Sequence, residues 1–177
     1  MSLSPASTRA RAAVLLIAPL LGACEGPSAN ATFAGAAPSS DTYPPVGAAL
    51  EIRCGTLDCH GSSARNLRLY GINGVRLDPL GITGDQSTTP QELIASYASV
   101  ISIQPEVLAR IMTDGGQRPE RWLLITKGRG TEGHKGETRM LEGDDTDRCV
   151  TSWLLGAVDV PRCEAAALLL PPGGDEF

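Results

Sequence analysis

The chain has 177 residues, of which 42% are hydrophobic, 20% charged and 4% aromatic, and its formal net charge at pH 7 is −5. This length suits one globular domain and is too short for two of ordinary size. The acidic balance argues against general nucleic-acid binding, which requires a concentrated basic face. Five cysteines and two histidines are the scarce reactive residues, and an odd number of cysteines leaves one outside any pairing.

The first residues contain the parts of an export signal. Arg9 and Arg11 precede an apolar run at residues 12–21, which is too short to span a bilayer as a helix. The following Leu21-Gly22-Ala23-Cys24 resembles the lipobox of bacterial lipoproteins, which implies that residues 1–23 are removed and that Cys24 carries a lipid. The alternative is an ordinary signal peptide cleaved beside a cysteine. Export implies a cell-envelope location, periplasmic or on the outer surface, where thiols tend to be oxidised or capped.

The composition divides the exported chain into three parts. Residues 24–43 contain almost no large apolar side chains, so they are predicted to form a flexible tether. Residues 165–177 include two prolines followed by two glycines and are predicted to be a disordered tail. The folded domain is therefore expected over residues 44–164.

Helix signals dominate within that domain, and Gly-rich connections separate them. A first helix is expected from Pro44-Pro45 to Cys54, and Thr89-Pro90-Gln91-Glu92 has the capping-box pattern of a second helix start. Further helices are expected from Pro105 to Gly115-Gly116, and from the acidic residues 144–147 towards Ala157. Short strands fit residues 67–70 and 123–126, without the long alternation of a large sheet. The predicted class is a mainly α single domain of about four short helices.

The stretch Cys54-Gly-Thr-Leu-Asp-Cys59-His60-Gly61 carries the most specific chemistry. Two thiols followed directly by a histidine are the order used to attach haem, because the thiols form thioethers with its vinyl groups and the imidazole binds the iron. The common spacing has two residues between the cysteines, whereas four separate them here. We predict that Cys54 and Cys59 attach one haem c and that His60 is its proximal ligand.

With this motif, the chain resembles the small c-type cytochrome domains of exported bacterial proteins. The resemblance spans residues 44–156 and includes the helix leading into the motif, an Arg-Leu pattern after it, and the segment Trp153-Leu-Leu-Gly-Ala157. It implies a cytochrome c-like fold in which the first and last helices cross beside the haem. It also implies electron transfer with redox protein partners, rather than catalysis on a small-molecule substrate.

An electron carrier of this kind normally has a second axial ligand from the far half of the domain. His134, in the segment Gly133-His-Lys-Gly136, is the preferred candidate because it is the only other histidine. Met140 is the alternative through its thioether, and Met112 is a third candidate on a helix face. Two imidazole ligands imply a lower reduction potential than histidine with methionine.

The other two cysteines, Cys149 and Cys163, flank the last predicted helix. In an oxidising compartment they are expected to form a disulfide that closes a loop of 14 residues. The alternative is a framework of two disulfides that also includes Cys54 and Cys59, in which His60 has no ligand role.

Other sites fit the sequence less well. A zinc site from Cys54, Cys59, His60 and His134 places two adjacent ligands in an awkward tetrahedral geometry. The acidic residues 142–147 lack the twelve-residue pattern of a calcium loop. No cysteine has the surroundings of a catalytic nucleophile. Three arginines after His60 are candidate partners of haem propionates, with a solvent-exposed face as the alternative: Arg65, Arg68 and Arg76.

The sequence thus predicts a lipid-anchored monohaem cytochrome in the cell envelope. It is expected to be an electron carrier rather than an enzyme, to have redox protein partners, and to bind no nucleic acid. The alternative is a haem-free surface lipoprotein that forms a disulfide-stapled binding or structural module.

Overall fold

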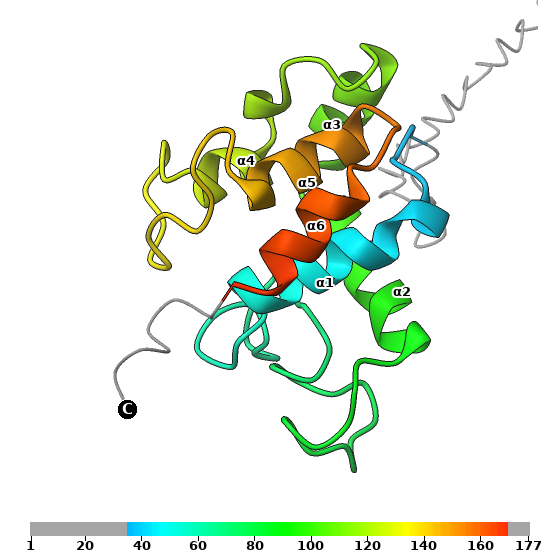
Figure 1. Cartoon of the computed structure of the whole chain (residues 1–177), viewed down its shortest axis with the longest axis vertical. Coiled ribbons are helices and arrows are strands. Elements are labelled where there is room, and N and C mark those ends of the chain that lie inside the picture. Colours follow the sequence, from blue (N-terminus) through cyan, green and yellow to red (C-terminus); the bar gives the residue numbers. More distant parts are fainter. Residues whose placement is uncertain (1–34, 170–177) are drawn as a thin grey trace, which may run out of the picture. The chain divides into compact units, whose positions relative to one another are not determined.

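The computed structural model describes residues 35–169. Within this range the chain forms six α-helices and two short 3-10 helices, and it contains no strand. The α-helices are α1 (Tyr43–Cys54), α2 (Pro90–Ile101), α3 (Pro105–Thr113), α4 (Leu123–Gly128), α5 (Asp145–Leu154) and α6 (Val160–Ala167); the 3-10 helices are η1 (Ser40–Thr42) and η2 (Pro119–Arg121). The prediction of a mainly α chain is confirmed (Figure 1). The predicted signal peptide and the lipidation site at Cys24 lie outside the described residues.

The helix starts agree with the capping signals in the sequence. At α2, the Thr89 hydroxyl accepts a hydrogen bond from the Glu92 amide (3.2 Å), and the Glu92 carboxylate accepts one from the Thr89 amide (2.9 Å). At α5, the Asp144 carboxylate accepts a hydrogen bond from the Asp147 amide at 2.8 Å. These side chains satisfy backbone donors that have no partner within the first helical turn, and they define where each helix begins.

The strand predicted at residues 123–126 is wrong, because this segment forms most of α4. A short apolar run does not distinguish a strand from a buried helical turn. The preceding Trp122 fixes the start of the helical turn. Its buried indole donates a hydrogen bond from Nε1 to the Ile103 carbonyl at 2.7 Å. The Trp122 carbonyl then accepts hydrogen bonds from the amides of Ile125 (2.9 Å) and Thr126 (3.1 Å), which closes the first helical turn.

The strand predicted at residues 67–70 is also wrong. Its backbone donors are used by side chains of α2, since the Arg68 amide donates to Ser99 Oγ and the Tyr70 amide donates to Ser96 Oγ, each at 2.8 Å. These bonds replace the backbone ladder that a strand requires. The segment therefore lies against a helix rather than beside another strand.

Helix α6 has no counterpart among the predicted helices. The Asp159 carboxylate caps it by accepting a hydrogen bond from the Arg162 amide at 3.3 Å, and Pro161 occupies its first turn. Both are recognised signals of a helix start, so the pattern Asp-Val-Pro identifies this helix in the sequence. α6 ends at Ala167 and packs against both α1 and α5 (Figure 1).

The N-terminal end of α1 is held by an aromatic cluster of Tyr43, Tyr97 and Trp153. The ring centroids of Tyr43 lie 5.3 Å from Trp153 and 5.4 Å from Tyr97. Trp153 Nε1 donates a hydrogen bond to the Ser39 carbonyl (3.1 Å), and the Tyr97 hydroxyl donates one to the Pro38 carbonyl (2.8 Å). Polar groups on buried rings usually find such partners. The cluster therefore joins α1, α2 and α5 to the segment that enters the fold.

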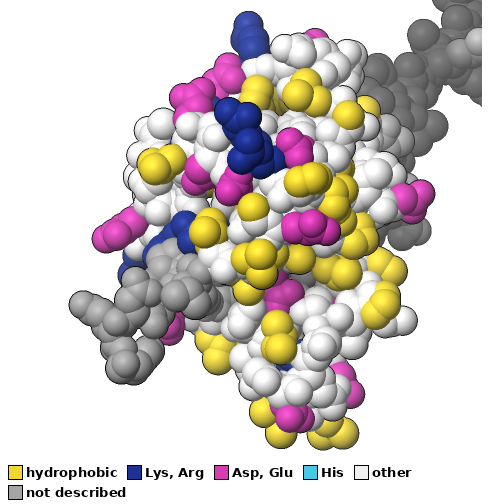
Figure 2. Space-filling model, viewed as in Figure 1, with side chains coloured by type: hydrophobic (Ala, Val, Ile, Leu, Met, Phe, Trp, Pro, Cys, Tyr) yellow, Lys and Arg dark blue, Asp and Glu magenta, His cyan; other side chains and the backbone are white. Residues whose placement is uncertain are grey.

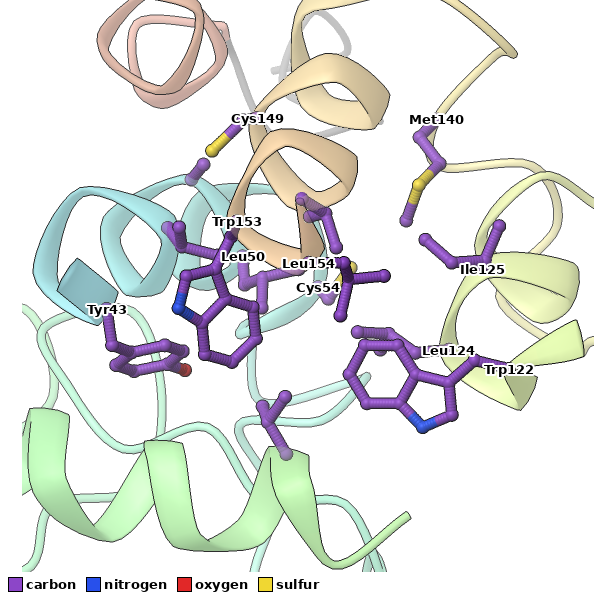
Figure 3. Close-up of a cluster of buried hydrophobic side chains, with 14 of the residues drawn as sticks. Tyr43, Leu50, Cys54, Trp122, Leu124, Ile125, Met140, Cys149, Trp153 and Leu154 are labelled. Carbon is purple, nitrogen blue, oxygen red and sulfur yellow. The ribbon is translucent and has the colours of Figure 1, made fainter. Parts of the chain in front are cut away.

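A second part of the core lies at the C-terminal end of α1. Figure 3 shows Cys54 in the same group of side chains as Leu154, Leu124 and Trp122, with the Met140 side chain directed towards Ile125. Met140 is 1% exposed and Cys54 is 9% exposed. The apolar core therefore extends from α1 to the segment that follows the Gly-rich connection after α4.

The surface of the described domain carries charges of both signs. On the face shown in Figure 2, acidic and basic side chains are interspersed with apolar ones, and no field of a single sign covers this face. Among the helices between residues 35 and 169, none has both the length and the apolar character needed to cross a membrane.

The predicted disulfide between Cys149 and Cys163 is confirmed, and it joins α5 to α6 across a separation of 14 residues. A loop of this length stabilises a protein by about 3 kcal/mol, because the bond restricts the unfolded chain. Replacing both cysteines by alanine is expected to lower the free energy of unfolding by about this amount in chemical denaturation.

A reducing agent provides the control for this prediction. Dithiothreitol is expected to lower the stability of the native chain and to leave that of the double variant unchanged. Equal stabilities of the oxidised native chain and the double variant would contradict the expectation.

Candidate functional site

The cysteine motif forms a closed turn at the C-terminal end of α1. Cys54 is the last residue of the helix, and its carbonyl accepts a hydrogen bond from the His60 amide at 2.9 Å. The Thr56 carbonyl accepts hydrogen bonds from the amides of Cys59 and Gly61, also at 2.9 Å. The additional residues between the cysteines are thus accommodated in the turn, and Leu57 at its tip is 54% exposed. His60 returns to the end of the helix from which the motif begins.

Gly61 allows this turn to pack closely against the following loop. A Cβ atom at this position would overlap the Gly55 carbonyl oxygen and would lie 2.7 Å from the Cα atom of Gly74. The Gly61 carbonyl also accepts a hydrogen bond from the Val75 amide at 2.6 Å. A glycine after His60 is therefore required by the backbone packing, because both neighbours are backbone atoms that a side chain would displace.

The structure brings His60 and His134 together, although they are far apart in the sequence. Their rings are nearly parallel, at 8°, and their centroids are 5.8 Å apart. Nδ1 of His60 lies 3.1 Å from the Leu67 carbonyl oxygen, and Nδ1 of His134 lies 3.3 Å from the Glu137 carbonyl oxygen. Since a carbonyl only accepts, each neutral ring carries its hydrogen on Nδ1 and leaves Nε2 as the nitrogen able to bind a metal.

The His134 ring rests against the backbone of its own loop. A Cβ atom on Gly136 would lie 2.7 Å from Cε1 of this ring, so the absence of a side chain at position 136 makes room for it. The His134 carbonyl accepts a hydrogen bond from the Glu137 amide at 3.0 Å, which closes a tight turn. Gly136 therefore shapes the position of the imidazole.

Both histidines line one pocket of about 550 Å³. Cofactor sites typically have volumes of about 300–1,000 Å³. Cys54 and Met140 also line this pocket, whereas Cys59 is half-buried in the preceding turn and Met112 packs at the edge of the core, both outside the pocket lining. The structure thus assembles Cys54, both histidines and Met140, but neither Cys59 nor Met112, on the pocket wall.

The positive charge at the pocket differs in part from the sequence prediction. Arg65 lines the pocket as expected, but Arg76 lies in a buried ion pair with Glu92 at 2.7 Å and is not available to a pocket ligand. Arg139 and Lys127 also line the pocket, and Lys127 Nζ is paired with the exposed Glu132 carboxylate at 2.9 Å. Three cations therefore surround it, two of them from the segment that follows Leu123.

Arg139 is the most informative of these cations. Its Nε atom is buried and has no hydrogen-bond partner among the described residues. A buried donor on a charged group is costly to leave without an acceptor. An acidic group of a ligand in the pocket is the chemistry that would satisfy it.

The surroundings of Cys54 and His60 favour the neutral form of each side chain. Burial raises the pKa of the Cys54 thiol to about 12, against the opposing charges of Arg53 and Arg139. Burial also lowers the pKa of His60, and the nearby charges of His134 and Arg65 act in the same direction. Cys54 is therefore a protonated thiol at neutral pH, and His60 is held in the form that binds a metal.

Cys54 and Cys59 are not disulfide-bonded to each other or to the Cys149–Cys163 pair. Of the alternative two-disulfide framework, the described residues contain only the Cys149–Cys163 bond, and the framework stays a hypothesis. No group of three or more His, Cys, Asp or Glu side chains within residues 35–169 is arranged to hold a metal ion. The four residues considered for zinc do not form such a site.

Comparison of the chain with protein-family models, curated proteins and solved structures found no match. The chemistry of the pocket therefore carries the functional conclusion. Its distinguishing feature is a pair of nearly parallel imidazoles in the same pocket as a buried thiol.

Proposed function

We propose that the chain is an extracytoplasmic, membrane-anchored, monohaem c-type cytochrome that acts in electron transfer. The observation that carries the proposal is the arrangement of His60 and His134, whose rings are 5.8 Å apart in one pocket with both Nδ1 atoms held by backbone carbonyls. Paired imidazoles with the same free nitrogen are suited to axial ligation of one iron.

The residues of the pocket fit a covalently attached haem. Cys54 and Cys59 would form the thioethers, His60 would be the proximal ligand and His134 the distal ligand. The unpartnered Nε of Arg139 would receive a propionate carboxylate, with Lys127 and Arg65 nearby. Bound haem would supply one iron that changes between the ferrous and ferric states.

The chain's own residues hold the ligands in place and restrict water. The Leu67 carbonyl fixes the tautomer and orientation of His60. Leu67 and Leu124 are 8% and 7% exposed and form apolar parts of the wall. A buried apolar surrounding favours electron transfer at a closed site over reaction with solvent species.

His134 is the better supported distal ligand, because its ring lies 5.8 Å from that of His60 and lines the same pocket. Met140 also reaches the pocket, but its side chain packs so closely on Gly128 that a Cβ atom there would overlap the Met140 methyl group. Met140 is therefore assigned to the core and retained as the alternative ligand.

Cys24 would carry the lipid, and residues 24–43 would connect it to the domain. This arrangement places the cytochrome at a membrane surface of the cell envelope, periplasmic or exposed outside, where it would exchange electrons with redox proteins. In the haem-free alternative, Cys54 and Cys59 would instead form a second disulfide; both are free thiols in the described structure.

The decisive experiment is expression of the full chain together with cytochrome maturation factors. Haem is expected to remain attached after denaturation, with the absorption spectrum of a thioether-linked haem. The Cys54→Ser/Cys59→Ser variant is expected to lose it completely. The spectra of the two single variants will report whether Cys59, which lies outside the pocket lining, forms the second thioether.

The Cys149→Ala/Cys163→Ala variant is the matched control, because it also lacks two cysteines but is expected to retain haem. A colourless native chain in the presence of active maturation factors would overturn the proposed function and favour the haem-free module.

A further inference from the structure

Arg53 connects the two halves of the candidate site. It lies in the last turn of α1, directly before Cys54. Its Nε and Nη2 atoms donate hydrogen bonds to the Arg139 carbonyl at 3.1 and 2.9 Å, across 86 residues of sequence. One guanidinium thus links the helix that ends in the cysteine motif to the segment that follows His134.

The segment held by Arg53 is the base of the loop that carries His134. The amides of Arg139 and Met140 both donate to the Gly128 carbonyl, at 2.8 and 3.1 Å, so that residues 129–138 form a loop closed at its two ends. On one side of this loop, Lys127 Nζ donates a hydrogen bond to the Gly133 carbonyl at 2.6 Å. The loop is therefore closed by its own hydrogen bonds and tied to α5 by the Arg129–Asp147 ion pair, and Arg53 joins its base to α1.

We propose that Arg53 is a positioning residue that holds the His134 loop over the pocket. The two hydrogen bonds from Arg53 to the Arg139 carbonyl, called the Arg53 clamp below, do not depend on haem. The effect of this clamp on the sixth ligand of the iron rests on the proposed function. Displacement of the Arg139 backbone would carry with it the loop, the imidazole of His134 and the half-buried side chain of Arg139.

Arginine is suited to this role because its planar guanidinium presents two donors to one acceptor in a fixed geometry. The two bonds are charge-assisted and half-buried, which makes them stronger than bonds between neutral groups. Lysine offers a single compact charge on a flexible chain, so an Arg53→Lys variant is expected to restore only part of the function of the native residue.

The first test uses the full chain without haem and measures hydrogen exchange of the amides in residues 129–140. In Arg53→Met these amides are expected to exchange about tenfold faster or more, with an intermediate rate in Arg53→Lys. Arg121→Met is the matched control, since Arg121 pairs with Asp114 outside the pocket, and it is expected to leave this loop unchanged.

The second test uses the haem-loaded chain. Arg53→Met is expected to weaken low-spin character in the absorption spectrum and to raise the rate of carbon monoxide binding to the ferrous protein about tenfold or more. A general loss of stability would lower the melting temperature of the domain without giving this selective change in ligation. Arg53→Lys is expected to fall between the native chain and Arg53→Met in both measurements.

The outcomes separate this inference from the proposed function. A native chain that attaches no haem would overturn the proposed function. The hydrogen-exchange measurement on the haem-free chain would still show whether Arg53 holds the His134 loop. The inference would be overturned if the loop amides of both Arg53→Met and Arg53→Lys exchanged at the native rate. It would also be overturned if both haem-loaded variants kept the native absorption spectrum and the native rate of carbon monoxide binding. If Arg53→Met does not fold, native loop exchange and native ligation in Arg53→Lys and Arg53→Gln would overturn it equally.

Discussion

Replacing His134 with alanine is expected to convert the haem-loaded protein from a low-spin to a high-spin absorption spectrum. The variant removes the imidazole whose centroid lies 5.8 Å from that of His60 and leaves its space in the pocket open to solvent. Added imidazole is therefore expected to restore the low-spin spectrum of His134→Ala. Such rescue requires a vacated ligand position, and a distant structural effect would not produce it.

Met140→Leu is the matched variant for this prediction, because it removes the other candidate ligand and largely preserves side-chain volume. It is expected to retain the low-spin spectrum, at a cost below about 1.5 kcal/mol in stability. The opposite pattern, with a native spectrum in His134→Ala and an altered one in Met140→Leu, would assign the sixth position to Met140. The native reduction potential would then be higher than two imidazoles imply.

Replacing Glu92 with glutamine is expected to lower the free energy of unfolding at neutral pH by about 3–5 kcal/mol. The Glu92 carboxylate is buried beside Arg76, and it also accepts hydrogen bonds from the amides of Leu77 and Thr89. Loss of its charge leaves the Arg76 guanidinium buried without a counterion. The loop between the cysteine motif and α2 loses one of its attachments to that helix, and the bonds to Ser96 and Ser99 remain.

This effect is expected to depend on pH. Burial raises the pKa of Glu92, but the hydrogen bonds from Arg76, Thr89 and Leu77 outweigh it and lower the pKa from 4.5 to about 2. A carboxylate with a lowered folded-state pKa stabilises the fold above the unfolded-state value, and this contribution is lost as the pH falls through the folded-state value. The stability difference between native and Glu92→Gln chains is therefore expected to shrink between about pH 4.5 and pH 2.

Denaturant unfolding at a series of pH values measures this difference. Glu164→Gln serves as the control because it removes an exposed carboxylate, and its stability is expected to stay within about 0.5 kcal/mol of the native chain at neutral pH. A stability difference for Glu92→Gln that remains constant from pH 7 to pH 2 would contradict the assignment of the effect to the ion pair.

The parts of the fold that were predicted correctly have signals within a few residues of one another. Thr89 and Glu92 are neighbours on one helical turn, and Asp144 caps the helix that begins beside it. The cysteine motif is likewise a local pattern, and its turn is closed by the amide of His60. Local hydrogen bonds of this kind are specified by side chains that the sequence displays side by side.

The parts that were not predicted depend on the path of the chain. Arg76 was expected near the haem propionates, but the loop directs it to Glu92, where its guanidinium pairs with the carboxylate that caps α2. Arg139 has no local pattern that identifies it as a pocket residue. Its role becomes visible only when the loop after α4 returns to α1 and meets Arg53.

The hydrogen bonds to the carbonyls of Pro38 and Ser39 have a mechanical consequence for the proposed membrane anchor. A pull on the preceding chain acts first on the hydrogen bonds from Tyr97 and Trp153, and then on the aromatic cluster behind them. Cys54 lies at the opposite end of α1, whose 12 residues span about 18 Å. In the proposed lipid-anchored protein, a pull on the chain would thus act at the end of α1 that lies away from Cys54 and the pocket.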